Sequence, residues 1–190
     1  MSKAADRRTT RTKALLQKAH VDVMLKKGYE AMTIQDICDA ANVGRSTFYA
    51  HYKSKGDLRR GSFEHLRMLL VERRSAAAAA SGRGLGFSLA LFQHAKEYLP
   101  LYRALAGSRG AVLGLGAIRK ILLDLVADEF GARRASGPES LPQEVAVQYV
   151  VGAYMAVLTW WLDQGAKASP EKLDEAFQRM VYPGVREFAD

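Results

Sequence analysis

The sequence predicts an all-α protein, with an N-terminal three-helix domain of the helix-turn-helix kind followed by a C-terminal helical bundle. Three observations support this fold class. Five of the 190 residues are proline, whereas alanine and leucine are frequent. No stretch alternates apolar and polar residues as a half-buried strand would, and no Asn-Gly or Asp-Gly pair marks a tight hairpin. A chain of this length can bury a sizeable core in one or two domains.

The first helix is predicted over residues 12–27. Apolar residues recur there at i, i+4 spacing, which is typical of a helix with one buried side. Two adjacent rows carry this pattern: Leu15, Ala19 and Val23, and Leu16, His20 and Met24. Gly28 suits the position just after the helix, where a left-handed backbone is common. Residues 1–10 are expected to form a disordered basic arm ahead of this helix.

Capping residues predict the next helix starts. Thr33 is followed three residues later by Asp36, and Ser54 is followed three residues later by Asp57. Each hydroxyl can accept from a free N–H of the first helical turn, where an acidic side chain is also favourable. Between the two caps, the Asn42–Gly44 segment suits a tight turn. The predicted helices therefore cover 34–41, a short segment ending near 51, and a long segment from 55 towards 80.

The rest of the chain reads as helices separated by glycine and proline. They are predicted near 86–97, 99–106, 110–131, 142–164 and 170–188. The segment 81–86 carries three glycines and is expected to separate two modules. We assign residues 1–10 to the arm, 11–55 to the helix-turn-helix domain and 56–190 to the helical bundle. Residues 145–162 carry no charge, and we interpret this run as a buried or interface helix rather than a membrane span.

The charge of the chain is concentrated in its first part. The net charge is +8; residues 1–75 hold sixteen basic and eight acidic side chains, whereas residues 76–190 hold twelve of each. A basic segment beside a neutral one suggests a module that meets a polyanion. The single cysteine, Cys38, excludes a disulfide framework. With no apolar core of a signal peptide near the N-terminus, we expect a cytoplasmic location.

Residues 33–55 predict a helix-turn-helix. Small apolar residues such as Ile37, Ala41 and Val43 allow two short helices to cross closely. The second helix offers hydrogen-bonding side chains instead of a second apolar face. These are Arg45, Ser46, Thr47, Tyr49 and His51. A helix that reads DNA in the major groove needs such side chains, which can reach base edges and phosphates.

This segment resembles the DNA-binding domain of tetracycline-repressor-type (TetR-type) transcriptional regulators. The resemblance is specific over roughly residues 12–66. It depends on Gly28-Tyr29, Thr33, Ile37, Ala40-Ala41, Val43, Thr47, Phe48, Tyr49, Tyr52, Lys55 and Leu58. A fainter similarity covers 150–173, through Trp160-Trp161-Leu162-Asp163-Gln164-Gly165 and Ser169-Pro170-Glu171. The segment 80–145 is similar only in its helical character.

The resemblance implies roles for individual residues. Phosphate contacts are implied for Thr33, Tyr49, His51, Tyr52, Lys53 and Lys55, and base contacts for Gln35, Arg45, Ser46 and Thr47. Arg can pair with guanine through two hydrogen bonds and Gln with adenine in the same way. An alternative remains open for two of these residues: a role of Thr33 as a helix cap alone, and a role of Tyr52 in packing alone. Asn42 and Gly44 depart from the family pattern, and Gly44 removes one candidate base contact.

The resemblance also implies a homodimer through the last two helices, about 142–188, and an effector pocket in the bundle. Val145, Tyr149, Gly152, Ala156 and Thr159 have the spacing of an interface face. Candidate effector-binding residues are Phe87, Leu91, His94, Tyr98, Tyr102, Arg103, Tyr154 and Trp161. Such residues combine aromatic walls with a few polar groups, as small-molecule sites do. Aromatic residues at helical spacing are, however, also typical of an ordinary core.

We therefore expect a sequence-specific DNA-binding regulator, a repressor that a small-molecule effector releases from a palindromic operator. The alternative is an architectural helical protein that binds nucleic acid without sequence preference. We expect neither a cofactor nor a metal, since the four histidines and Cys38 lack the spacing of a ligand set. The sequence also lacks a phosphate-binding glycine loop, and we expect no enzymatic activity.

Overall fold

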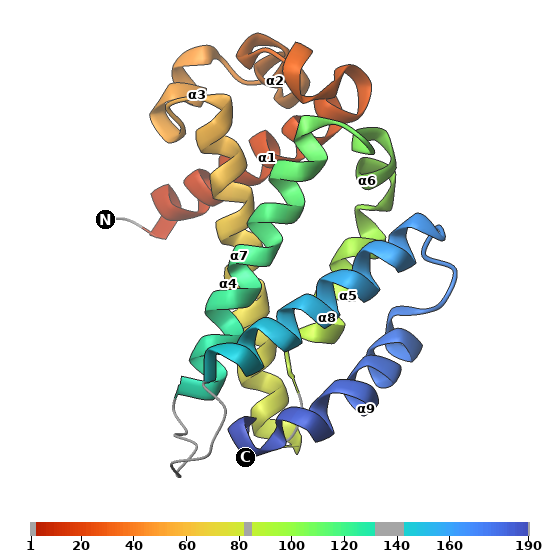
Figure 1. Ribbon diagram of the computed structural model, residues 1–190. Coiled ribbons are helices and arrows are strands. Elements are labelled where there is room, and N and C mark those ends of the chain that lie inside the picture. Colours follow the sequence, from red (N-terminus) through yellow and green to blue (C-terminus); the bar gives the residue numbers. More distant parts are fainter. Residues whose placement is uncertain (1–2, 82–84, 132–142, 190) are drawn as a thin grey trace. The chain divides into compact units, whose positions relative to one another are not determined.

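The computed structural model describes residues 3–81, 85–131 and 143–189. All regular structure in these ranges is helical, as predicted (Figure 1). The helices are α1 (Lys3–Ala31), α2 (Ile34–Ala41), α3 (Arg45–His51), α4 (Lys55–Ser81), α5 (Ser88–Glu97), α6 (Leu99–Leu105), α7 (Arg109–Gly131), α8 (Gln143–Asp163) and α9 (Pro170–Ala189).

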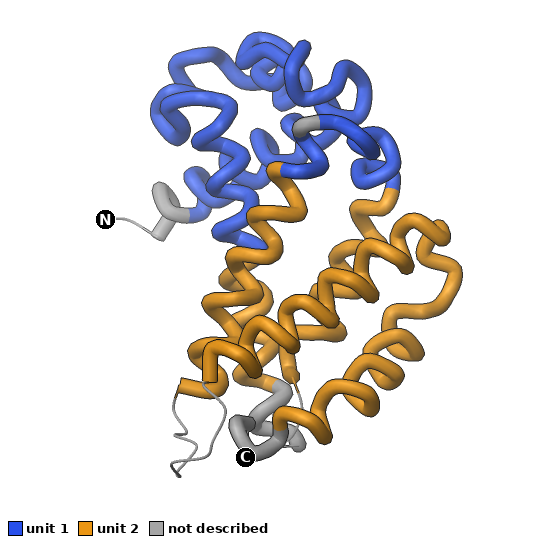
Figure 2. Tube along the Cα trace, viewed as in Figure 1, with its two compact units in different colours: residues 1–66, 100–112 blue, residues 67–99, 113–190 orange. Residues whose placement is uncertain are grey.

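The chain divides into two compact units (Figure 2). Unit 1 comprises Met1–Leu66 and Pro100–Val112, and unit 2 comprises Arg67–Leu99 and Leu113–Asp190. The first turns of α4 therefore belong with α1 to α3, although we assigned residues from 56 onwards to the bundle. The segment 100–112 also returns to unit 1, where Leu105 is buried in the core. No local pattern in the sequence indicates this return, because it depends on a long-range contact.

The predicted start of the first helix and the predicted disordered arm need correction. The first helix, α1, begins at Lys3 instead of residue 12, so residues 3–10 are helical. The physical reason is composition, because this stretch has no glycine or proline and contains Ala4 and Ala5. Leu16 is the first buried apolar residue along α1, and the described side chains before it are exposed or partly exposed. Residues 1–2 of the predicted arm lie outside the described residues.

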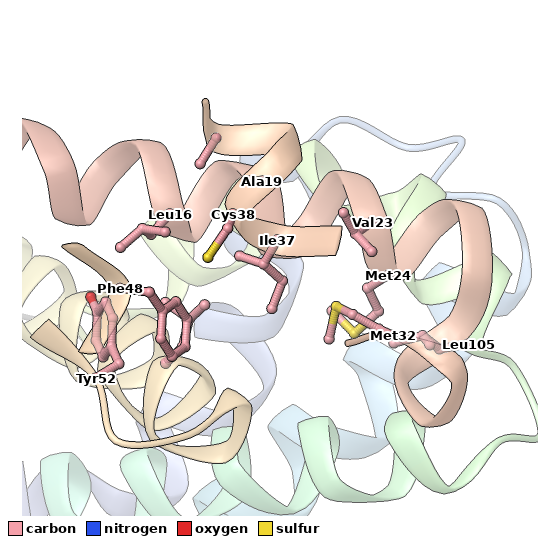
Figure 3. Packing of buried hydrophobic residues seen from close by; sticks show 12 residues of the cluster. Leu16, Ala19, Val23, Met24, Met32, Ile37, Cys38, Phe48, Tyr52 and Leu105 are labelled. Atoms are coloured by element: carbon pink, nitrogen blue, oxygen red, sulfur yellow. The ribbon is translucent and has the colours of Figure 1, made fainter. Parts of the chain in front are cut away.

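The core of unit 1 lies where α1, α2, α3 and the start of α4 meet (Figure 3). Its buried residues include Leu16, Ala19, Val23, Met24, Met32, Ile37, Cys38, Ala41, Phe48, Tyr52, Leu58 and Leu105. The predicted apolar rows of α1 are mostly confirmed, but Leu15 is 42% exposed. Leu16 and His20 of the second row are buried in the core.

The predicted capping and turn residues shape the helix-turn-helix. The hydroxyl of Thr33 accepts from the backbone N–H of Asp36, whose carboxylate in turn accepts from the backbone N–H of Thr33. Helix α2 ends at Asn42, which has a left-handed backbone with φ of 53° and ψ of 48°. The N–H of Val43 then donates to the carbonyl of Cys38 at 3.0 Å. These bonds satisfy both ends of α2 and direct the chain into α3.

Unit 2 is built around α5, α8 and α9. Phe92 and Tyr154 stack with their ring centroids 4.5 Å apart, and Phe177 meets Tyr154 edge-on at 5.1 Å. Among the described helices, α8 is long and apolar enough to cross a membrane by length and composition. One side of α8 is nevertheless buried, through residues such as Val150 and Leu158. This burial agrees with the prediction of a buried or interface helix over residues 145–162.

Candidate nucleic-acid interface

Helix α3 separates an inner face from an outer face. Phe48 is fully buried and fixes the inner face against the core. Arg45, Ser46 and Tyr49 are exposed on the other sides of this short helix, and Thr47 is partly exposed. Because one anchoring ring holds α3 against the rest of unit 1, its polar side chains are free to meet an external partner.

Arg45 and Tyr49 lie together on the exposed side of α3. A guanidinium nitrogen of Arg45 donates to the Tyr49 hydroxyl at 3.5 Å, and the guanidinium carbon lies 5.9 Å from the centroid of the Tyr49 ring. The Tyr49 ring in turn meets Phe48 edge-on, with centroids 5.5 Å apart. The spacing of four residues places Arg45 and Tyr49 one helical turn apart, so their side chains can support each other.

The start of α2 presents a second group of polar side chains. Thr33 is exposed and donates its hydroxyl to Asp36 at 2.8 Å while it caps the helix. A hydrogen bond from Lys27, together with those from Thr33, lowers the pKa of Asp36 to about 2, so the carboxylate stays charged. The amide of Gln35 donates to Asp39 at 2.8 Å, which fixes the orientation of an otherwise exposed side chain.

Two residues that the resemblance assigns to phosphate contact serve the fold in this structure. Tyr52 is 6% exposed and its ring packs on Phe48 with centroids 6.0 Å apart; burial raises the pKa of its hydroxyl. The ammonium of Lys55 donates to the carbonyls of Tyr29, Glu30 and Met32. In this structure the Tyr52 ring fills the core and the Lys55 ammonium binds backbone oxygens, and the phosphate contacts that the resemblance implies for both residues stay predictions.

His51 and Lys53 complete the predicted set. His51 is the last residue of α3 and is partly buried, whereas Lys53 is exposed in the connection to α4. The backbone N–H of Lys53 donates to Asp57 at 2.8 Å, which lowers the pKa of that carboxyl. Of the ten predicted residues, nine are exposed or partly exposed, and Tyr52 is buried. The nine are Thr33, Gln35, Arg45, Ser46, Thr47, Tyr49, His51, Lys53 and Lys55.

Two family models match the chain. Residues 16–60 match the model described as bacterial regulatory proteins, tetR family, and residues 85–183 match a transcriptional regulator C-terminal region. The chain belongs to the tetR family of bacterial regulatory proteins. The N-terminal match coincides with the helix-turn-helix described above and with the start of α4.

A curated transcriptional regulator matches nearly all of this chain. It is the uncharacterized HTH-type transcriptional regulator YxbF of Bacillus subtilis strain 168, which is 27% identical over 183 residues. The match covers 94% of this chain and 47% of YxbF, so the chain spans about half the length of that relative.

Solved structures of tetR-family regulators share the fold. A TetR transcriptional regulator from Streptococcus agalactiae 2603V superposes with a TM-score of 0.62 at 24% identity, covering 94% of this chain and 98% of that one. The transcriptional regulator FadR from Bacillus subtilis, solved in complex with stearoyl-CoA, superposes with a TM-score of 0.58 at 19% identity, covering 90% and 98%. At these identities the likeness concerns the fold alone.

The residues predicted for an effector pocket of this tetR-family chain fall into three groups. Phe87, Leu91, Tyr154 and Trp161 are buried in unit 2, in contact with the aromatic core. His94 and Tyr98 are partly buried on α5 and at its end, with ring centroids 4.5 Å apart. Tyr102 and Arg103 belong to unit 1. The buried group and the pair formed by His94 and Tyr98 both belong to unit 2, whereas Tyr102 and Arg103 do not.

Some contacts of the site were not predicted from the sequence. Lys27 pairs with Asp36 across nine residues, and no local pattern indicates this. The hydrogen bond between Gln35 and Asp39 could have been found, because residues four apart on a helix are neighbours. The contact at Gly61 was not predicted either: a Cβ there would lie 3.0 Å from the Tyr52 ring, so only glycine leaves that ring its full space. Within the described residues, no cluster of metal-ligating side chains is found.

Proposed function

We propose that this chain is a homodimeric repressor that binds a palindromic DNA operator in the cytoplasm and is released by a small-molecule effector. The observation that carries the DNA-binding part is the outer face of α3. Arg45, Ser46 and Tyr49 are exposed there, while the buried Phe48 ring holds the helix in place. Membership of a family of transcriptional regulators supports the proposal.

In this proposal, base reading and phosphate contact are divided between α2 and α3. Arg45, Ser46 and Thr47 at the start of α3, with Gln35 on α2, read base edges. The guanidinium of Arg45 can bind a guanine through two parallel hydrogen bonds. Phosphates are bound by Thr33, Tyr49, His51 and Lys53, which flank the base-reading residues along the chain.

An in vitro selection of bound DNA followed by affinity measurements tests this function. Wild-type protein should enrich one palindromic sequence and prefer it over random DNA. Arg45→Ala should lose about 1–3 kcal/mol of discrimination, roughly five- to 150-fold, at one base position. Arg73→Ala is the matched control, because it removes the same exposed cation from α4 in unit 2. No enriched sequence, together with equal affinity for random DNA, would instead support the architectural alternative.

The exposed apolar side of α8 supports the homodimer. Val145, Tyr149 and Trp160 are each about half exposed or more, and Met180 on α9 is 63% exposed. Scattered apolar residues on a surface are ordinary, but a row along one helix indicates a covered face. Nothing lies within 4 Å of a Cβ built at Gly152, so a second helix can approach closely there. A twofold axis through this face would place the same row of both copies in contact.

The mass of the protein in solution tests the dimer. Trp160→Glu places a charge in the proposed interface, so the dimer mass seen by light scattering should shift towards the monomer. Met68→Glu is the matched control, because Met68 is also an exposed apolar residue but lies on α4. A wild-type monomer, or an unchanged dimer of Trp160→Glu, would contradict the proposed interface.

The effector part of the proposal concerns unit 2. The neighbour FadR was solved with stearoyl-CoA, and unit 2 of this chain contains a buried aromatic core and the partly buried polar pair His94 and Tyr98. An effector acts only if it binds the DNA-free conformation more tightly than the DNA-bound one. Stearoyl-CoA, added to the protein–operator complex, should release DNA, while free coenzyme A serves as the control. If neither stearoyl-CoA nor other candidate small molecules release DNA, the effector proposal fails.

A further inference from the structure

The charge around the start of α2 does not favour DNA. Residues 26–39, which include the proposed DNA contacts Thr33 and Gln35, carry two basic and three acidic side chains. Residues 40–60, in contrast, carry five basic side chains and one acidic side chain. A phosphate that approaches the start of α2 therefore meets more negative than positive charge nearby, and like charges at short distance repel each other.

Asp36 is bonded directly to Thr33, the proposed phosphate contact. Its Oδ2 atom accepts from the backbone N–H of Thr33 at 2.9 Å and from the Thr33 hydroxyl at 2.8 Å. The backbone bond keeps the carboxylate in place even when the hydroxyl turns towards a phosphate. The pKa of Asp36 is about 2, so this carboxylate is ionised at pH 7. A phosphate bound at Thr33 would thus lie close to a fixed negative charge.

Lys27, which directly precedes the break of α1 at Gly28, supplies a positive charge at the same place. Its ammonium donates to Oδ1 of Asp36 at 2.5 Å, whereas Thr33 binds Oδ2, so the two donors occupy different carboxylate oxygens. The side chains of Lys27 and Asp36 are 52% and 23% exposed. An ion pair this exposed contributes little to folding stability, so its main effect is on the charge that the start of α2 presents to its surroundings.

We infer that Lys27 neutralises the acidic cap of α2: it pairs with Asp36, so that the carboxylate holds Thr33 in place without repelling a phosphate bound there. The inference rests on the proposed function, because the repulsion affects binding only if Thr33 meets DNA. Lys27 is therefore a positioning residue that acts on DNA through Asp36. This role requires the acidic partner, and a direct contact between Lys27 and phosphate would not.

A double-mutant cycle with the selected operator duplex separates these two roles. Lys27→Met should weaken binding about fivefold or more, as expected for a carboxylate left unpaired about 4 Å from a phosphate in water. In an Asp36→Asn background, where the amide oxygen can still accept from Thr33, the same substitution should change the affinity less than about twofold. Lys27→Arg keeps the charge and should bind like wild type.

Lys26→Met is the matched control for the cycle. Lys26 is the neighbouring exposed lysine of α1, and it is not among the groups that lower the pKa of Asp36. Its substitution should therefore have the same effect on affinity with and without Asp36→Asn. An equal loss from Lys27→Met in both backgrounds would show that Lys27 binds phosphate itself, and it would overturn the inference.

Two measurements on the free protein complete the test. Lys27→Met should leave the urea midpoint close to that of wild type, and a large drop in the midpoint would show a structural role instead. The same substitution should raise the pKa of Asp36, measured by NMR of its carboxyl carbon, because the Lys27 hydrogen bond is the largest cause of its low value. An unchanged pKa would overturn the inference alone. If wild-type protein binds no duplex at all, the proposed function fails, and the inference fails with it.

Discussion

His20 makes unit 1 sensitive to moderate acid. It lies on α1 with 2% of its surface exposed, and neither ring nitrogen has a hydrogen-bond partner among the described residues. The Tyr29 ring meets the imidazole edge-on, with centroids 6.4 Å apart. Burial, and to a smaller extent the positive charges of Arg59 and Lys55, together lower the pKa of His20 from 6.5 to about 4. The imidazole is therefore neutral in the folded protein at pH 7.

The sign of the pH dependence follows from proton binding in the two states. Between pH 6.5 and pH 4 the unfolded chain holds a proton on His20 and the folded chain does not. Stability is therefore fully present above pH 6.5 and is lost as the pH falls towards 4. The gap between the two pKa values corresponds to a loss of about 3 kcal/mol below pH 4, of which about 2 kcal/mol is reached at pH 5.

His20→Leu should remove this pH dependence. It also removes two buried polar atoms without partners, so we expect a gain of about 1–2 kcal/mol at pH 7 and about 2 kcal/mol more at pH 5. Native-state amide exchange of peptides from α1 to α3 measures the free energy of opening of unit 1 at both pH values. His65→Leu is the matched control, because His65 is exposed on α4. Equal pH 5 losses in wild type and His20→Leu, or an NMR titration of His20 near 6.5, would refute the reasoning.

Three further predictions concern packing and backbone. Gly61→Ala would place a Cβ 3.0 Å from the Tyr52 ring, so it should lower the free energy of unfolding, measured in urea, by about 1 kcal/mol. Gly56→Ala, where a Cβ would meet no atom nearer than 3.6 Å, should raise it by up to about 1 kcal/mol. Equal changes for the two substitutions would mean that the Tyr52 ring moves aside at little cost. Asn42→Ala at φ of 53° should be about 1 kcal/mol less stable than Asn42→Gly, and the reverse order would contradict the left-handed turn. Tyr154→Phe removes a buried hydroxyl that donates to a carbonyl of α5 at 2.9 Å, so it should cost about 1–2 kcal/mol; an unchanged urea midpoint would show that this bond contributes nothing.

Local chemistry predicted the helix-turn-helix well. The cap formed by Thr33 and Asp36 and the turn at Asn42 are confirmed, because each depends on residues within three or four positions of one another. The Gly28 break is confirmed in the same way, since its backbone leaves the helical region. A capping residue acts on its own helix end, so the sequence contains all the information needed.

The sequence did not predict the long-range contacts. The resemblance implies phosphate contacts for Tyr52 and Lys55. Neither the burial of the Tyr52 ring against Gly61 nor the binding of the Lys55 ammonium to carbonyls 23 to 26 residues away was predicted. The packing of residues 100–112 into unit 1, which buries Leu105, is also a long-range contact that was not predicted. Such contacts follow from the path of the chain in space, and a residue's type and immediate neighbours do not define that path.

The concentration of charge in the first part of the chain therefore overstates how many phosphates it can bind. The net charge of +8 arises there, but several of its cations are already engaged within the fold. Lys27 pairs with Asp36, Lys55 binds three carbonyls and Arg60 pairs with Asp57. Counterion release counts only cations that reach phosphates, so the salt dependence of binding should reflect exposed side chains such as Arg45 and Lys53.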